Sequence, residues 1–504
     1  MAKRQPIFTL ISLLLLSLMF CGALPAAENP TPVTVDWTKV IRVSRMTPTF
    51  QVVVNPPLRR GSTLHDPAFR AAHDLGCDLV RYVPWLPYPR LAVAELEPPN
   101  DGKTSWDFSL IDPLTVDFLE AAAGHPVMLN FSTIPQWMFK TPKPVPYPDN
   151  PDQPVWNYTQ GTELRDPSMK ELADYYARLV SWYTRGGFED EYGVEHQSGH
   201  HYKIDYWEVF NEVDFEHSMA PQQYTDRYDA VVEALQRVAP QMKFAGLALA
   251  APSREPDYFE YFLNHAHHKP GIPLDMITYH FYATPSADQT AEIQPYTFFD
   301  QADHFLDTVR YVESIRQRLS PQTQTDINEL GSIAADDNRS GPRVIPNSYW
   351  TLSGALYAYV YAELAALGIE YAGESQLVGY PTQFPSVSMV DWTTGQPNAR
   401  YWVLKLLHDN FGPGDKLVDT HINNSYVYAR GMVTRDGRHK VLLVNKRDRT
   451  FVVSVPGAAA GYSDVVDQQT GSQPPVGSQL PSDEVTLGGL AVAVVTLAVV
   501  TLAK

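Results

Sequence analysis

The sequence predicts an α/β protein, a (β/α)8 barrel followed by a C-terminal antiparallel β-sandwich. Three observations predict it. Short apolar strands alternate with amphipathic helices over about 360 residues, the pattern of parallel strands joined by crossover helices. The segment 411–415, Phe-Gly-Pro-Gly-Asp, ends that alternation. Beyond it, residues alternate with the period of two that strands show, and no helical pattern appears.

Eight strand–helix repeats account for the barrel. The expected strands cover residues 50–54, 78–85, 126–131, 203–210, 243–250, 274–282, 325–330 and 369–376. The expected helices cover residues 65–76, 111–123, 167–185, 224–238, 257–266, 300–319, 349–367 and 398–410. A doubly wound open sheet is the alternative, but no glycine-rich phosphate fingerprint follows the first strand, where that fold usually shows one.

The chain is expected to divide into a barrel domain and a C-terminal β-sandwich domain. Residues 28–410 form the expected catalytic barrel and residues 411–504 the β-sandwich, to which the strand-like segment 33–43 could add. Sandwich strands are expected at residues 426–433, 440–445, 450–455 and 484–490. The apolar run 487–503 is rich in β-branched residues, so we interpret it as one or two final strands, with a membrane anchor as the alternative. A Pro-rich loop at 142–161 leaves the third strand and is expected to shape a cleft.

Residues 1–27 have the features of a secretory signal peptide. Lys3 and Arg4 precede an apolar stretch at 7–20, and small residues follow it. A secreted or periplasmic protein is therefore expected, with an uncleaved anchor as the alternative. Of the two cysteines, Cys21 lies inside the signal, which leaves Cys77 without an intrachain disulfide partner.

Composition narrows the classes of partner. A net charge of −18 disfavours nucleic acid and anionic membrane surfaces, so no membrane contact beyond the export signal is expected. Aromatic residues make up 12% of the chain, which suits either stacking on sugar rings or filling a large core. No cofactor and no metal is expected. Two histidine groups, at 196, 200, 201 and at 265, 267, 268, lack zinc-hydrolase spacing and are interpreted as solvated loops. The oligomeric state is left open.

Two glutamates carry the functional argument. Glu212 lies in the stretch 206–214, Tyr-Trp-Glu-Val-Phe-Asn-Glu-Val-Asp, at the C-terminal end of the fourth strand. Glu329 lies at the top of the seventh strand, and these two strands face each other across a barrel. Carboxylates about 5 Å apart on either side of a glycosidic bond support double displacement with retention. Glu212 would start protonated because Glu329 repels its charge, and the Asn211 amide can donate to a sugar hydroxyl.

With these motifs the chain resembles glycoside hydrolase family 39, in the clan of retaining (β/α)8 enzymes. This family holds β-xylosidases and α-L-iduronidases. Its acid/base motif is aromatic-Glu-x-Trp-Asn-Glu-Pro, which the chain matches at Trp207, Glu208, Asn211 and Glu212. The chain departs from it at Phe210, where Trp is usual, and at Val213, where Pro is usual. The stretch 277–282, Ile-Thr-Tyr-His-Phe-Tyr, is similar to the family's sixth-strand signature.

The resemblance implies roles for several residues. It implies Glu212 as general acid/base and Glu329 as nucleophile. Arg81, at the end of the second strand, matches the clan's arginine that hydrogen-bonds the nucleophile and would keep it ionised. His280 and Tyr282 would border the site from the sixth strand, with Tyr282 able to reach Glu329.

For other residues, a role is predicted only from the position along a strand. Glu208 is four residues before Glu212 on a strand, so it lies deeper in the barrel and is expected to be a buried supporting carboxylate. Trp137 follows a strand end, as do Trp85 and Trp392, and one of the three is expected to stack on a sugar. Glu374, on the eighth strand, could bind a sugar hydroxyl or merely pair with a basic side chain.

The expected protein is a retaining glycosidase that cleaves a neutral oligo- or polysaccharide, with a β-xyloside as the first substrate to consider. The alternatives are an endo-acting hydrolase of an exopolysaccharide and a non-catalytic glycan-binding protein on a glycosidase fold. An iduronidase-like enzyme would need basic residues near the sugar carboxylate, and the barrel-top motifs offer few beyond Arg81.

Overall fold

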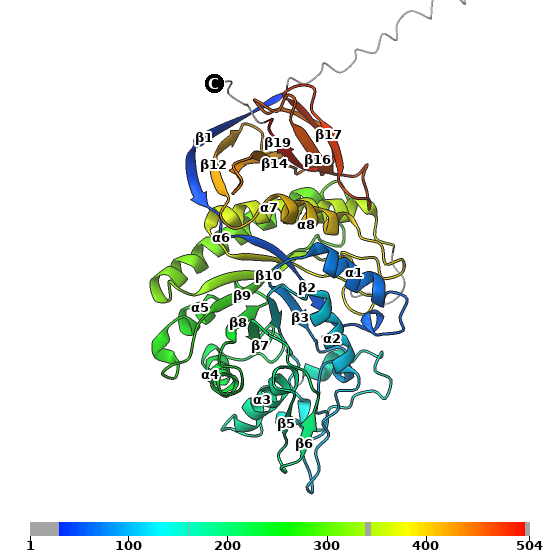
Figure 1. Cartoon of the computed structure of the whole chain (residues 1–504), viewed down its shortest axis with the longest axis vertical. Helices are drawn as coiled ribbons and strands as arrows, with labels where there is room; N and C mark the ends of the chain where they lie inside the picture. The colour runs from blue at the N-terminus through cyan, green and yellow to red at the C-terminus, as the bar shows by residue number, and fades with distance from the viewer. Residues whose placement is uncertain (1–29, 160, 338–343, 499–504) are drawn as a thin grey trace, which may run out of the picture.

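A computed structural model describes residues 30–159, 161–337 and 344–498, and the expected signal peptide lies outside them. Figure 1 shows a ring of strands and helices with a separate stack of strands above it. The predicted combination of barrel and β-sandwich is confirmed.

The barrel closes in the strand order β10-β11-β2-β3-β4-β7-β8-β9, and all its neighbouring strands are parallel. Within the described residues these eight strands are β2 (Thr47–Val53), β3 (Val80–Val83), β4 (Val127–Leu129), β7 (Tyr206–Val209), β8 (Lys243–Leu249), β9 (Met276–Ala283), β10 (Gln324–Ser332) and β11 (Tyr371–Glu374). Each overlaps its predicted range. Glu212 follows β7 and Glu329 lies on β10, and these two strands are separated by β8 and β9 on one side of the ring.

Helices surround this ring (Figure 1). They are α1 (His65–Leu75), α2 (Ile111–Ala121), α3 (Lys170–Thr184), α4 (Pro221–Val238), α5 (Pro256–Phe262), α6 (Gln294–Leu319), α7 (Asn347–Leu367) and α8 (Ala399–Asn410). Helices α4 and α6 begin earlier than predicted, because Pro221 and Pro295 occupy first-turn positions. A proline there has its φ already set and lacks only an N–H that would have no helical partner.

Short 3-10 turns occur in the loops between these elements. They are η1 (Pro56–Leu58), η2 (Pro89–Leu91), η3 (Gln136–Met138), η4 (Trp156–Thr159), η5 (His265–His267) and η6 (Pro385–Val387). A hairpin of β5 (Gly187–Glu189) and β6 (Glu195–Gln197) follows α3 and was not predicted, because three-residue strands carry too little periodicity.

The β-sandwich runs in the order β17-β16-β19-β14-β13-β12-β1-β15-β18. Its strands are β1 (Thr31–Val43), β12 (Lys416–Ile422), β13 (Val427–Val433), β14 (His439–Asn445), β15 (Phe451–Ser454), β16 (Tyr462–Val466), β17 (Val476–Gln479), β18 (Glu484–Leu487) and β19 (Val492–Thr496). Strand β1 pairs antiparallel with β12 and, at Thr31 and Pro32, parallel with β15. The segment 33–43 therefore adds to the sandwich, as expected, whereas β12, β16 and β17 were not predicted.

The C-terminal apolar run supplies a central strand. Strand β19 lies between β14 and β16, and Val492–Val495 are fully buried. The strand interpretation is correct for Val492–Thr496, and residues 499–503 lie outside the described part. Across the described ranges, no helix is long and apolar enough to cross a membrane. Helices α7 and α8 pack between the sandwich and the barrel, where α7 contacts β14 and β19 on one side and β10 and β11 on the other (Figure 1).

Candidate active site

The chain turns sharply where β7 ends. Phe210 and Glu212 both have left-handed backbone conformations, with φ of 66° and 41°. Such conformations cost energy in residues other than glycine and cluster at functional sites. The Glu212 N–H donates to the Ala248 carbonyl at 2.9 Å, and its carbonyl accepts from the Phe215 and Glu216 N–H groups at 2.7 Å each. The turn is thus fixed at both ends, and the Glu212 side chain enters the cavity at the barrel mouth.

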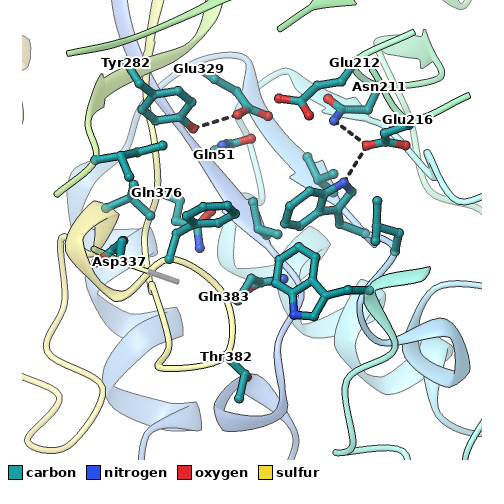
Figure 2. A pocket seen from close by; sticks show the side chains of 18 of the residues that line it. Gln51, Asn211, Glu212, Glu216, Tyr282, Glu329, Asp337, Gln376, Thr382 and Gln383 are labelled. Carbon is teal, nitrogen blue, oxygen red and sulfur yellow. Dashed lines mark hydrogen bonds between the residues drawn. The ribbon is translucent and has the colours of Figure 1, made fainter. Parts of the chain in front are cut away.

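Glu329 reaches the same place from β10, whose residues pair with β9 so that Glu329 lies beside His280. Arg81 Nη1 donates to Glu329 Oε1 at 2.6 Å, and the Tyr282 hydroxyl donates to Oε2 at 2.7 Å. Both oxygens are therefore held, and Figure 2 shows the Tyr282 contact next to Glu212.

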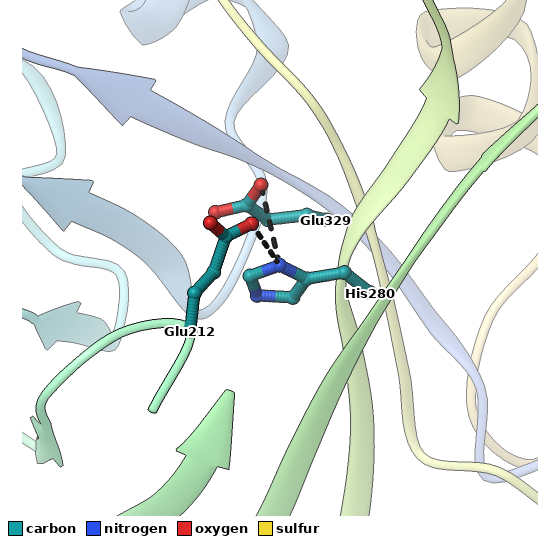
Figure 3. A group of neighbouring side chains, drawn as sticks. All are labelled: Glu212, His280 and Glu329. Carbon is teal, nitrogen blue, oxygen red and sulfur yellow. Dashed lines mark hydrogen bonds and ion pairs between the residues drawn. The ribbon is translucent and has the colours of Figure 1, made fainter. Parts of the chain in front are cut away.

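The two glutamates converge on one histidine ring (Figure 3). His280 Nδ1 lies 3.2 Å from Glu212 Oε1 and 3.5 Å from Glu329 Oε2. One ligand atom from each of the three side chains lies within 4.8 Å of the others. Carboxyl groups this close cannot both ionise freely, so their proton affinities must diverge.

The surroundings push the two pKa values in opposite directions. Burial raises the pKa of Glu212, and the charge of Glu329 adds to the effect, although His280 opposes it. Burial also works to raise the pKa of Glu329, but His280, Arg81 and the Tyr282 hydrogen bond outweigh it and lower that pKa. For His280, the attraction of both carboxylates outweighs burial and raises the pKa. One carboxyl group is thus prepared to hold a proton and the other to stay ionised.

Arg81 is the buried centre of the network below the site. Its Nε donates to Glu208 Oε2 at 2.6 Å, Nη1 also reaches Gln51 Oε1 at 2.7 Å, and Nη2 reaches Asn211 Oδ1 at 2.6 Å. Arg81 does not line the cavity, so it positions Glu329 and Asn211 rather than contacting a sugar.

Glu208 lies deeper in the barrel, as predicted. It is fully buried and accepts hydrogen bonds from Arg81, Asn130, Thr278 and Asn328. With its oxygens occupied by donors it has no access to a substrate. Its role is to balance the charge of Arg81.

A cavity of about 590 Å³ opens beside the carboxylates, and Asn211, Glu212, Tyr282 and Glu329 all line it (Figure 2). One wall is aromatic. The Trp85 ring meets Trp156 edge to face, with centroids 5.4 Å apart, and Phe384 lies 5.8 Å from Trp156 and 6.2 Å from Trp85. Trp156 comes from the Pro-rich loop 142–161, which was expected to shape the cleft. Among the described lining residues there is no Lys or Arg, whereas four carry carboxyl groups: Glu212, Glu216, Glu329 and Asp337.

Two predicted sugar contacts lie outside this cavity. The Trp137 indole N–H donates to the Glu95 carbonyl at 2.8 Å, and the Arg165 guanidinium covers its ring at 4.3 Å. Glu374 is fully buried and accepts from Arg400 Nε at 2.9 Å. Trp137 is therefore not placed to stack on a sugar, and Glu374 takes the ion-pair alternative. Of the three tryptophans considered, Trp85 alone is among the described lining residues.

The departures from the family motif also lie away from the cavity. Phe210 packs between Tyr176 and Tyr224, and Val213 is fully buried. Neither lines the cavity, so both change the packing behind the site rather than its walls.

Several residues that line the cavity were not predicted from the sequence. Gln51 interrupts the apolar run of β2, and that interruption was the available signal. Glu216 follows Glu212 by one helical turn, and Trp156 and Phe384 come from loops whose course the sequence does not specify. Glu216 Oε1 accepts from Trp85 Nε1 at 2.6 Å and from Asn211 Nδ2 at 2.9 Å. Burial and the neighbouring Glu212 raise the pKa of Glu216 well above its usual value.

Three side chains of the two histidine groups, His196, His200 and His268, contact carboxylates. His196 contacts Asp190 at 3.0 Å. His268 is buried between Asp229 and the Phe262 carbonyl, so it does not lie in a solvated loop as expected. Over the described ranges, the one group with metal-ligand spacing is Glu212, His280 and Glu329. Arg81 already supplies a positive charge beside Glu329, which suits a catalytic carboxylate pair.

A (β/α)8 barrel with a pair of glutamates at its mouth, one just after the fourth strand and one on the seventh, is the arrangement expected of a glycoside hydrolase. The match to a family model specifies the family. Residues 26–329 match the model for glycosyl hydrolases family 39, and the chain belongs to this family. The resemblance inferred from the motifs is thereby confirmed. No curated protein matches the chain.

Solved structures share the fold at low sequence identity. A GH51 arabinofuranosidase from Xanthomonas axonopodis pv. citri has a TM-score of 0.63 and 12% identity, covering 93% of this chain and 100% of that one. A glucosidase from Croceicoccus marinus has a TM-score of 0.58 and 15% identity, covering 94% and 100%. A GH30 endoxylanase from Clostridium papyrosolvens C71 has a TM-score of 0.54 and 15% identity, covering 93% and 100%.

Proposed function

We propose that the protein is a retaining glycosidase in which Glu329 is the nucleophile and Glu212 the general acid/base. The observation that carries this proposal is the approach of the two carboxylates, since one oxygen of Glu212 lies within 4.8 Å of one oxygen of Glu329. Retaining glycosidases separate their carboxyl groups by about 5–5.5 Å, whereas inverting enzymes need about 6.5–9.5 Å to admit a water molecule. The short separation favours direct attack by Glu329.

The reaction proceeds in two displacements. Glu329 Oε attacks the anomeric carbon and forms an ester, while Glu212 donates its proton to the glycosidic oxygen and the alcohol departs. The Glu329 charge disappears in the ester, so the pKa of Glu212 falls and it can act as a base. Glu212 then takes a proton from water, whose oxygen attacks the anomeric carbon and releases the Glu329 carboxylate.

The surrounding residues support each step. Arg81 and Tyr282 stabilise the ionised Glu329 before attack and as it is released. His280 lies between the two carboxylates, where its proton moderates their repulsion. The Asn211 amide is held by Arg81 and lines the cavity, and in this proposal it binds a hydroxyl next to the anomeric carbon.

A neutral glycan is the substrate class that fits this cavity best. Its described lining offers four carboxyl groups and no cation, so a uronic acid would meet repulsion without a compensating ion pair. Within that class, a β-xyloside is the first candidate because the family includes β-xylosidases. Trp85 and Trp156 supply aromatic faces for the apolar side of a sugar ring.

A panel of nitrophenyl glycosides and polysaccharides tests the proposal. Wild-type protein should hydrolyse a neutral glycoside, and NMR should show that the first product keeps the anomeric configuration of the substrate. Glu329→Ala should abolish turnover. Azide should rescue Glu212→Ala on an activated substrate by replacing the attacking water. An inverted first product, or natural-glycan activity in Glu212→Ala equal to wild type, would contradict it.

We also propose that the protein is exported, on the strength of the signal-peptide features in residues 1–27. Expression of the full chain in a secreting host, followed by N-terminal sequencing, tests this. A start near residue 28 in the medium or periplasm is expected. An intact Met1 terminus confined to the cell interior would contradict export.

A further inference from the structure

Glu216 is a buried carboxyl group in the active-site cavity that the two-displacement reaction does not use. It lines the cavity and is 6% exposed, yet no ion-pair partner contacts it within the described residues. Burying an acidic side chain without a neighbouring cation destabilises the folded protein unless hydrogen bonds compensate for the lost hydration. Its contacts therefore call for an explanation.

Its position follows from the turn after β7. The Phe215 and Glu216 N–H groups both donate to the Glu212 carbonyl, so residues 212–216 form one helical turn. Asp214 fixes this turn by accepting from the Ala250 and Ala251 N–H groups at 3.0 and 2.9 Å. Residues four apart lie on one face of such a turn, which places Glu216 next to the acid/base.

One oxygen of Glu216 connects two different walls of the cavity. Oε1 accepts from Trp85 Nε1 at 2.6 Å and from Asn211 Nδ2 at 2.9 Å, and Figure 2 shows the contact with Asn211. Trp85 comes from the loop after β3, and Asn211 from the end of β7. The contact decides the rotation of the indole, which in turn meets Trp156 and Phe384.

The same contact fixes the Asn211 amide. Arg81 Nη2 donates to Asn211 Oδ1, and Glu216 accepts from Nδ2. The amide is thus held at both ends, and its oxygen and nitrogen cannot exchange places. A hydroxyl-binding amide held in this way presents one fixed pattern of donor and acceptor to a sugar.

From these contacts we propose that Glu216 is a positioning residue that sets sugar recognition, by holding the Trp85 aromatic wall and the Asn211 amide in a single geometry. This inference rests on the proposed glycosidase function. The role requires an acceptor oxygen rather than a negative charge. The raised pKa of Glu216 agrees with that requirement, because a protonated carboxyl group still offers its carbonyl oxygen to both donors.

Kinetics of three variants on the best glycoside of the panel test the proposal. Glu216→Ala should raise KM about tenfold, because two hydrogen bonds that orient sugar contacts are lost, and should lower kcat by less than about threefold. Glu216→Gln keeps the acceptor oxygen and should restore most of that KM. Glu216→Asp, one methylene shorter, should resemble Ala, and it keeps the test decisive if Ala does not fold.

Glu95→Ala is the matched control, since Glu95 is a buried carboxyl group outside the cavity. It should leave KM unchanged even if it lowers Tm. An unchanged KM in Glu216→Ala, or a Gln variant as impaired as Ala, would overturn the proposal.

A second measurement does not depend on turnover. The indole N–H resonance of Trp85, assigned by its loss in Trp85→Phe, should move upfield in Glu216→Ala and stay near its wild-type position in Glu216→Gln. If no glycoside of the panel is hydrolysed, the proposed function is wrong. In that case the Trp85 resonance alone tests whether Glu216 holds the Trp85 indole. An unmoved resonance in Glu216→Ala would then overturn the inference.

Discussion

The guanidinium of Arg81 and the carboxylate of Glu329 form a buried ion pair, with 2.6 Å between Nη1 and Oε1. The same guanidinium binds Glu208 and Asn211, so one cation connects the proposed nucleophile Glu329, the buried Glu208 carboxylate and the Asn211 amide. The ionisation of Glu329 is therefore coupled to the geometry of its neighbours.

Replacing Arg81 should affect both stability and pH dependence. Arg81→Met leaves two buried carboxylates without their cation and should cost about 3–5 kcal/mol in the free energy of unfolding, measured with urea. In Arg81→Lys, a single ammonium cannot serve four acceptors, and the pKa of Glu329 should rise. In the proposed mechanism Glu329 acts as an anion, so the enzyme loses activity as pH falls through the pKa of Glu329. The acid limb of kcat/KM should then move to higher pH. An acid limb at the wild-type position would contradict the ion-pair account.

Removing the Tyr282 hydroxyl should slow the reaction without unfolding the protein. Tyr282→Phe deletes a donor to Glu329 Oε2 and should lower kcat/KM about 10- to 100-fold, the value of one hydrogen bond to a charged group. Tyr279→Phe is the control on the same strand, because its buried hydroxyl has no hydrogen-bond partner among the described residues. Equal kcat/KM in the two variants would show that the Tyr282 contact has no catalytic value.

The alkaline limb of the pH profile should belong to Glu212. Burial raises the pKa of this carboxyl group, so the acid form persists above the usual range of a glutamate and is lost at higher pH. For an aryl glycoside with a good leaving group, Glu212→Gln should retain measurable kcat/KM and lose the alkaline limb. Persistence of that limb in the variant would assign it to another group.

Glu374 should affect stability rather than substrate binding. Burial raises the pKa of Glu374 from 4.5 to about 7, although the neighbouring Arg400 opposes the rise, so the folded protein binds more protons than the unfolded chain between these values. Stability from this group therefore falls as pH rises from 4.5 to 7. Glutamine does not titrate, so Glu374→Gln should gain stability relative to wild type on going from pH 5 to pH 8, with KM unchanged. Urea unfolding at both pH values checks this, and a constant difference would contradict it.

Most of the barrel could be predicted because its signals are local. The strands next to Glu212 and Glu329 appear in the sequence as apolar runs that end in polar residues. Closure of the predicted barrel then puts the two glutamates on facing strands. Proline at a helix start moved the boundaries of α4 and α6, and strands of three residues, such as β5, have no measurable period.

The site could be predicted only where a residue stands on a strand. Arg81, His280 and Tyr282 all lie on strands. The contacts of Arg81 and Tyr282 with Glu329 were expected, whereas His280 was expected only to border the site. Trp137 and Glu374 also stand near strand ends, but Arg165 and Arg400 bind them away from the cavity. Trp156 and Phe384 reach the cavity through loops, whose paths depend on tertiary packing. Glu216 was missed because a helical turn, not a strand, continues the chain after Glu212.

Trapping the glycosyl ester tests the central claim most directly. A 2-deoxy-2-fluoro glycoside with a good leaving group, matched to the best substrate of the panel, slows breakdown of the ester so that the labelled protein can be digested and mapped by mass spectrometry. We predict one equivalent of sugar on Glu329, formed in wild type and absent in Glu329→Gln. A label on any other residue, or complete turnover through an inverted product with no label, would contradict the assignment of Glu329 as nucleophile.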